Sequence, residues 1–100
     1  MADDFAASPE VRRARILYRE QKQALRLLAE QVMLADPSTD TYAVAQDIAT
    51  LLHNISGTAA YFGESDFGCR ASALEQPVRS SFTAGLVQPL CSQILACIDG

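Results

Sequence analysis

The sequence lacks the features that mark several classes of protein. Proline and glycine account for only 4 and 5 of its 100 residues, which excludes a collagen-like or low-complexity chain. No apolar run approaches the roughly 18 residues that a membrane span requires. The first five residues include two acids and show no basic-then-apolar secretory signal. These absences predict a cytoplasmic protein that does not enter a membrane.

Cysteine is scarce, and its pattern predicts neither a disulfide framework nor a zinc site. Cys69, Cys91 and Cys97 are odd in number and form no CxxC pair. We therefore expect reduced, buried side chains that act as small hydrophobic residues. Paired carboxylates, a Ser-His-Asp spacing and a glycine-rich phosphate loop are also missing, so we expect no metal and no cofactor in this chain.

The remaining composition is that of one globular domain over residues 1–100. Apolar residues make up 49% of the chain and charged residues 20%. A chain of this length buries about 65% of its unfolded surface, which is enough for a core without metal or disulfide. The net charge of -4 argues against non-specific binding to nucleic acid.

The basic residues are concentrated near the start of the chain, where six of the eight precede residue 27. Five of them recur at intervals of three and four, and we call these the basic stripe: Arg12, Arg15, Arg19, Lys22 and Arg26. Only Arg26 is followed four residues later by an acid, Glu30. The stripe is either a solvated helix face or a docking rim for an acidic protein, and the sequence leaves both interpretations open.

Strand signals are nearly absent, whereas apolar residues recur at helical spacing along the whole chain. Caps and breakers predict four helices, over about 8–35, 39–63, 65–77 and 80–98, with Pro89 kinking the last. Four amphipathic helices with short links predict an all-α fold, an antiparallel up-down four-helix bundle. The residues expected to face the core are Val11, Ala14, Tyr18, Leu25, Leu28, Val32, Val44, Ile48, Leu51, Leu52, Ile55, Ala59, Phe62, Phe67, Ala71, Leu74, Phe82, Leu86, Leu90, Ile94 and Ile98. Tyr61 is expected to be a half-buried anchor.

The single histidine lies on the outer face of the second predicted helix. At about 100° per residue, His53 falls roughly 140° from the centre of the apolar stripe, so its ring should be exposed. The strip around it is small or uncharged, where an exposed helix normally carries Lys, Glu and Arg: Gln46, Ala49, Thr50, Gly57 and Ala60. A mid-helix glycine costs about 1 kcal/mol relative to alanine. That cost is understandable if a large partner approaches the backbone beside His53.

A lone histidine is most often an ordinary surface or capping residue, but the surrounding residues form a pattern. His53–Gly63 (HNISGTAAYFG), followed by Phe67, Ala71 and Leu74-Glu75, resembles the signature of the histidine-containing phosphotransfer (HPt) family. In that family the motif is His-x-Leu-Lys-Gly-Ser-Ala-x-x-Leu-Gly. The resemblance implies a four-helix bundle that accepts phosphate from the aspartate of one receiver domain and passes it to another.

By this resemblance a ring nitrogen of His53, Nε2, carries the phosphate, and Gly57 leaves room for the receiver. The implied partners are response-regulator receiver domains or a hybrid histidine kinase, with Mg²⁺ bound by the receiver. The chain would be a phosphocarrier without kinase activity, and we expect a monomer.

The chain departs from the family pattern at two positions. Ser56 stands where the family commonly has Lys or Arg, and Glu64 stands where it often has Ala. A neutral hydroxyl is a weaker donor to phosphoryl oxygens than a cation. The sequence therefore also allows a second hypothesis, an HPt-like helical adaptor that binds a receiver or kinase without carrying phosphate.

Overall fold

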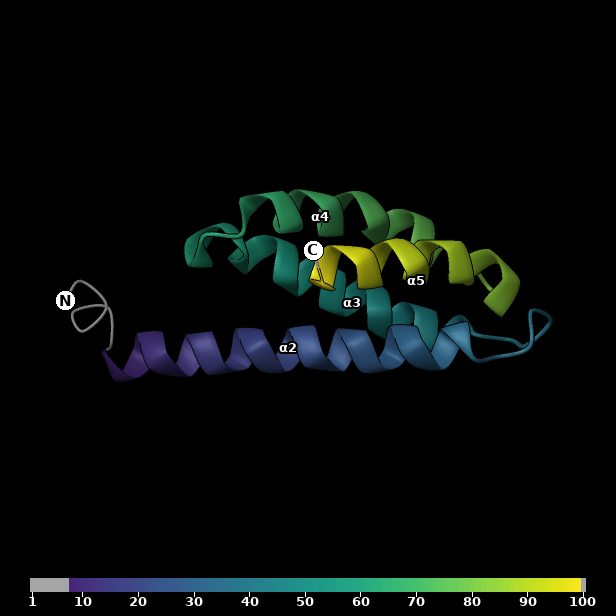
Figure 1. The fold of residues 1–100 in the computed structure, drawn as a ribbon, viewed down its shortest axis with the longest axis horizontal. Coiled ribbons are helices and arrows are strands. Elements are labelled where there is room, and N and C mark those ends of the chain that lie inside the picture. The colour runs from purple at the N-terminus through teal and green to yellow at the C-terminus, as the bar shows by residue number, and fades with distance from the viewer. Residues whose placement is uncertain (1–7, 100) are drawn as a thin grey trace.

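The computed structural model describes residues 8–99. In this range it contains α2 (Pro9–Met33), α3 (Tyr42–Thr58), the 3-10 turn η1 (Ala60–Phe62), α4 (Ser65–Arg79) and α5 (Ala84–Asp99), and no strand. The four α-helices lie lengthwise beside one another in an elongated body of 51 × 19 × 19 Å (Figure 1). The all-α prediction is confirmed. The first five residues, from which the absence of a secretory signal was predicted, lie outside the described residues.

None of the helices between residues 8 and 99 carries an apolar stretch of the length needed to cross a bilayer.

The helix ends follow the predicted signals, with two shifts. Ser8 caps α2, its hydroxyl accepting the Val11 amide at 3.2 Å, and Gly63 adopts a φ of 79° at the end of η1. The second helix, expected from about residue 39, has Thr41 at its cap position, and the Asp40 carboxylate accepts the Tyr42 amide at 2.9 Å. The last turn before Gly63 tightens to a 3-10 conformation.

Helix α4 begins at Ser65, as predicted, and continues past its proline. Ser65 is the first residue of the helix. Glu64 takes the cap position, but its side chain accepts no hydrogen bond from the first amides of the helix. The helix passes through Pro77 and ends at Arg79. This extra half-turn places Arg79 one turn beyond Glu75 on the same face.

A single core joins all four helices. Its largest fully buried side chains are Leu25, Val32, Ile48, Leu52, Ile55, Val78, Val87, Cys91 and Ile94. Helices α3 and α4 make the most extensive contact, and they approach closely at Gly68. A Cβ on Gly68 would lie 2.9 Å from the Ala59 Cβ, closer than packed side chains allow. Glycine at this position therefore sets the spacing between α3 and α4.

The predicted inward stripe of the last helix is wrong at its beginning. Phe82 and Leu86 are 53% and 60% exposed, whereas Ala84 and Val87 are buried. A stripe that repeats strictly every four residues drifts by about 40° per step from the helical period, because the helix has 3.6 residues per turn. The helix also begins only at Ala84, so Phe82 lies outside it and stacks on Tyr42.

The prediction that all three cysteines are buried is also wrong. All three are free thiols, but Cys69 on α4 is exposed and Cys97 is only partly covered. Cys91 is buried, and burial raises the pKa of its thiol to about 11. Only Cys91 therefore behaves as the small core residue that was expected.

The N-terminal half of α2 is tied to the α3–α4 turn by one polar cluster. The Tyr18 hydroxyl donates to the Glu64 carboxylate at 2.6 Å, and the Lys22 ammonium donates to the same oxygen at 2.9 Å. The Tyr18 bond and the Lys22 cation lower the pKa of Glu64, while burial raises the pKa of Tyr18 well above its usual value. Glu64 thus has a structural partner on α2.

Candidate functional site

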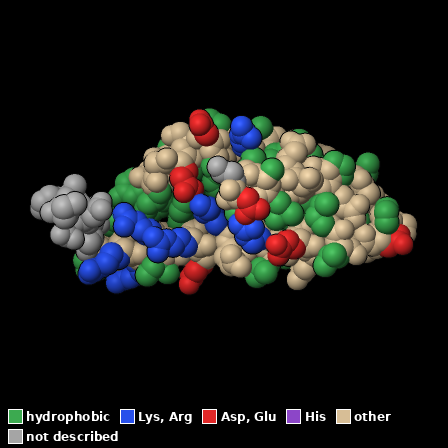
Figure 2. Space-filling view, viewed as in Figure 1, with side chains coloured by type: hydrophobic (Ala, Val, Ile, Leu, Met, Phe, Trp, Pro, Cys, Tyr) green, Lys and Arg blue, Asp and Glu red, His purple; other side chains and the backbone are tan. Residues whose placement is uncertain are grey.

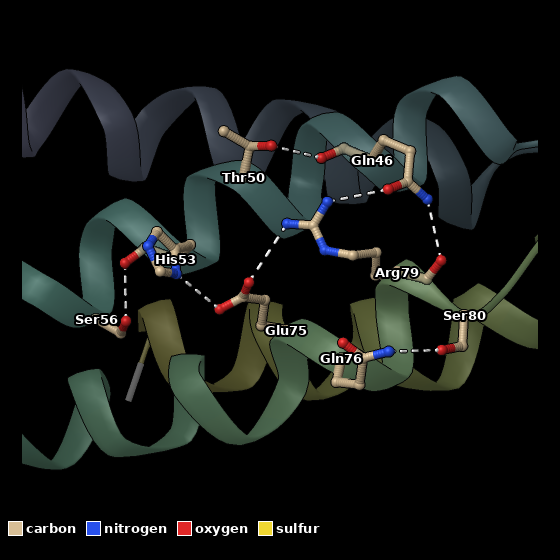
Figure 3. A network of polar contacts seen from close by, with 8 residues as sticks. All are labelled: Gln46, Thr50, His53, Ser56, Glu75, Gln76, Arg79 and Ser80. Atoms are coloured by element: carbon tan, nitrogen blue, oxygen red, sulfur yellow. Dashed lines mark hydrogen bonds and ion pairs between the residues drawn. The ribbon is translucent and has the colours of Figure 1, made fainter.

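The site is built around His53, whose ring stands clear of the core as predicted. It projects from α3, and 70% of its side chain is exposed. Its Nδ1 lies 3.1 Å from the Oε1 of Glu75 on α4, so the ring is oriented across the α3–α4 face (Figure 3). The imidazole is therefore both open to solvent and held by a carboxylate on a neighbouring helix.

The carboxylate of Glu75 belongs to a chain of polar contacts along this face (Figure 3). The Arg79 guanidinium donates to Glu75 Oε2 at 3.3 Å and to Gln46 Oε1 at 3.0 Å. The Gln46 amide in turn donates to the backbone oxygen of Arg79 at 3.0 Å. Glu75 is thus held between a cation and the imidazole, and Gln46 fixes that cation from α3.

The Glu75 contact determines which ring nitrogen is available. A carboxylate only accepts hydrogen bonds, so the contact assigns the proton of the neutral imidazole to Nδ1. Nε2 then carries the lone pair and is the nitrogen left free by the Glu75 contact. The same arrangement, in which a carboxylate fixes the tautomer and supports positive charge on the ring, activates histidine in hydrolytic enzymes.

The surface one turn beyond His53 is open. Gly57 is exposed, and a Cβ built on it would have no atom within 4 Å apart from its own helix backbone and neighbours. Thr50, one turn before His53, is also exposed, and its hydroxyl donates to the Gln46 backbone oxygen at 3.0 Å. Both flanks of the imidazole therefore present small, uncharged groups to solvent.

Two members of the predicted strip lie elsewhere. Ala49 is fully buried, because α3 packs between α2 and α4. These two helices cover more of the surface of α3 than its apolar stripe alone predicted. Ala60 is exposed, but it belongs to η1 beyond the end of α3, where α-helical spacing no longer applies. Gln46 is half-buried and bonded to Arg79, so it supports the site rather than forming open surface.

Ser56 does not replace the basic residue of the HPt pattern. Its hydroxyl donates to the backbone oxygen of His53 at 2.8 Å and is therefore engaged within its own helix. The cation associated with this site is Arg79, which reaches it through Glu75. This positive charge is therefore two contacts removed from the imidazole.

Sequence reasoning missed the roles of Glu75 and Arg79. Glu75 could have been found, since it occupies the Leu-Glu position of the HPt resemblance. Arg79 gave no signal, because the helix was expected to end near Pro77.

An apolar hollow of about 680 Å³ adjoins the site between α2 and the end of α3. Gly57, Thr58, Tyr61 and Phe62 line one side of it, and Val11, Ala14, Leu17 and Tyr18 are among the residues on the other. Tyr61, predicted to be half-buried, is 69% exposed and meets Phe62 edge to face at 5.0 Å. The side of the site that faces α2 is therefore apolar and aromatic.

The basic stripe lies on a different face. Figure 2 shows Lys and Arg side chains gathered over the N-terminal half of α2, and no histidine is visible from this side. Arg15, Arg19 and Lys22 line a hollow with Glu64, and neither His53 nor Glu75 is among its lining residues. The stripe is therefore not a rim around His53.

No group of three or more His, Cys, Asp or Glu side chains suited to hold a metal ion occurs in the part of the chain from 8 to 99. Comparison of the chain with models of protein families, with curated proteins and with solved structures gives no match.

Proposed function

We propose that this protein is a histidine-containing phosphotransfer protein that relays a phosphoryl group between the aspartates of receiver domains through phosphohistidine at His53. The observation that carries the proposal is the exposed imidazole held at Nδ1 by Glu75, which leaves Nε2 free beside the bare surface at Gly57. The reversal of the colour gradient along successive helices in Figure 1 supports the corresponding up-down antiparallel bundle.

In the proposed reaction the Nε2 lone pair attacks the phosphorus of a receiver's aspartyl phosphate, in line with the bond to the leaving oxygen. The N–P bond forms as the O–P bond breaks, and the aspartate leaves as a carboxylate. The proton on Nδ1 stays in place, so the phosphorylated ring carries a positive charge. Glu75 stabilises that charge across its 3.1 Å contact, and Arg79 balances the carboxylate.

The partner supplies the rest of the chemistry. The receiver would hold Mg²⁺ and stabilise the transferring phosphoryl group, so this chain would act as a phosphocarrier without kinase activity. The open surface at Gly57 and the apolar hollow beside it support docking of a protein-sized partner. The cytoplasm is the compartment where such receivers would be met.

The test is transfer from a phosphorylated receiver domain in the presence of Mg²⁺. Radiolabel should move to the protein, be lost in acid and survive in alkali, as a phosphoramidate does. His53→Gln should abolish labelling while leaving the helical circular dichroism spectrum unchanged, because the ring is exposed. Label that persists in His53→Gln would refute the assignment of this residue.

A second function, an HPt-like adaptor that binds a receiver or kinase without accepting phosphate, is favoured by one observation. Ser56 provides no cation for the phosphoryl oxygens, and its hydroxyl is bonded to the His53 backbone. This function would be established if the wild-type protein and His53→Gln bind a receiver equally and no label transfers during long incubation.

A further inference from the structure

The proposed function leaves the basic stripe on α2 unused. Among the described residues only two members of the stripe make ion pairs, Lys22 with Glu64 and Arg26 with Asp99. A solvated helix face would interleave acids at intervals of three and four, because like charges at that spacing destabilise a helix by about 0.2–0.5 kcal/mol per pair. The stripe keeps its cations together instead.

These cations border a groove rather than a flat surface. A hollow of about 620 Å³ is lined by Arg15, Arg19 and Lys22 of α2 and by aromatic side chains that include Tyr18 and Tyr61. A smaller hollow of about 220 Å³ continues along α2, where Arg19 and Lys22 are joined by Arg26. The shared residues make the two hollows one groove, and its cations span about 16 Å of helix.

The lining of the groove carries more positive than negative charge, although Arg26 is paired with Asp99. The lining residues of the two hollows include four cations, Arg15, Arg19, Lys22 and Arg26, and one acid, Glu64. Glu64 is already engaged by Tyr18 and Lys22. The chain as a whole carries a net charge of -4, so the groove is a local basic site on an acidic molecule.

We propose that this groove binds an acidic peptide segment of a partner protein, one that presents an apolar side chain among its carboxylates. The guanidinium groups suit bidentate recognition of carboxylates, and the exposed edge of Tyr61 offers an apolar contact. A nucleic acid is a poorer fit, because its extended charge would meet the acidic remainder of the molecule. The lining of the groove includes neither His53 nor Glu75, although Tyr61 and Phe62 also line the apolar hollow beside Gly57. Binding of the peptide does not require the phosphotransfer reaction.

The test uses the full chain and a fluorescein-labelled peptide of about 12 residues, rich in Asp and Glu with one central Phe, a length that spans the groove as a helix. Fluorescence anisotropy at about 0.05 M salt should show saturable binding, weakened at least tenfold at about 0.5 M salt by screening. The same peptide with Gln for every acid should not bind.

Charge reversal at the groove provides the matched comparison. Arg19→Glu should weaken peptide binding about tenfold, because it removes a lining cation and adds an anion. Arg13→Glu makes the same change in charge on the same helix, but Arg13 lines neither hollow, so it should weaken binding by about twofold or less. His53→Gln should bind the peptide as the wild type does.

Three results would overturn the proposal. One is failure of the peptide to bind at low salt, and another is an equal loss in Arg13→Glu and Arg19→Glu, which would reduce the effect to net charge. A labelled DNA duplex that binds more tightly than the peptide, with the same sensitivity to Arg19→Glu, would assign the groove to nucleic acid instead. Loss of phosphotransfer in His53→Gln has no bearing on any of these results.

Discussion

The α3–α4 face and the N-terminal half of α2 use charge in opposite ways. Around His53 the polar side chains form a chain of contacts. Gln46 accepts a hydrogen bond from Arg79, Arg79 pairs with Glu75, and Glu75 contacts the imidazole. Along α2 the cations gather on one side, and two acids, Glu64 and Asp99, tie them to the rest of the fold. The first arrangement orients a single imidazole ring through a chain of contacts, whereas the second places several cations side by side along one helix.

Of the variants that test the difference between these two regions, Gly57→Lys should have the largest effect, because its side chain would block the open surface beside His53. Phosphotransfer from a receiver should fall by at least about 100-fold, since a partner must approach within bonding distance of Nε2. The fold should be slightly more stable, by up to about 1 kcal/mol, because lysine favours a helix over glycine. Stopped-flow transfer rates and a urea unfolding curve measure the two effects. Transfer at the wild-type rate would show that receivers do not dock here.

A smaller effect is expected from Glu75→Ala, which removes the partner of Nδ1. Loss of a group that orients a histidine typically reduces activity about 10- to 100-fold. Transfer from the receiver should slow by that factor while receiver binding is retained, as measured by titration calorimetry. Glu75→Gln should recover part of the rate, because its side-chain oxygen can still accept the Nδ1–H bond. Equal rates in the wild type and Glu75→Ala would limit Glu75 to a structural role.

The next change tests the close approach of α3 and α4 at Gly68. Gly68→Ala places a methyl group 2.9 Å from the Ala59 Cβ, and overpacking of this kind costs about 1–3 kcal/mol, partly offset by helix propensity. We expect a net loss of about 1 kcal/mol in the free energy of unfolding. Gly57→Ala is the matched control, because it gains the same propensity in open space and should stabilise the fold. A gain in both variants would contradict the close approach.

The smallest effect is expected at Glu64, and it depends on pH. The bond from Tyr18 and the Lys22 cation lower the pKa of Glu64 in the folded protein. Ionised Glu64 therefore stabilises the fold above its ordinary pKa near 4.5, and this contribution is lost as the pH falls through the lowered pKa of the folded state. The carboxylate is 39% exposed, so the contribution should be below about 1 kcal/mol. Urea unfolding at pH 7 and about pH 3 should show a larger loss for the wild type than for Glu64→Gln. An equal loss would remove Glu64 from the acid response.

The number of helices and the exposure of His53 could be predicted from the sequence because both depend on local rules. Caps such as Ser8 and the stop at Gly63 act within one turn, and the direction of His53 follows from the helical period alone. The predicted inward stripe of α5 was wrong at its beginning. It placed apolar residues at strict intervals of four and started at Phe82, before the helix begins at Ala84.

The contacts across helices could not be predicted in this way. Whether Glu75 meets His53 depends on the register of α4 against α3, which is fixed by the close approach at Gly68 rather than by either helix alone. The burial of Ala49 likewise depends on how much of α3 its two neighbours cover. The position of the basic stripe relative to His53 required the arrangement of the whole bundle.

The bond from Gln46 to the backbone of Arg79 has a consequence for how this face can vary. The last carbonyl groups of a helix have no amide donors of their own, and Gln46 supplies one of these donors from α3. The same side chain also accepts the Arg79 guanidinium. Gln46 therefore bonds both the last backbone carbonyl of α4 and the guanidinium of its last residue. The end of α4 and the position of its positive charge are coupled, and replacing Gln46 would disturb both.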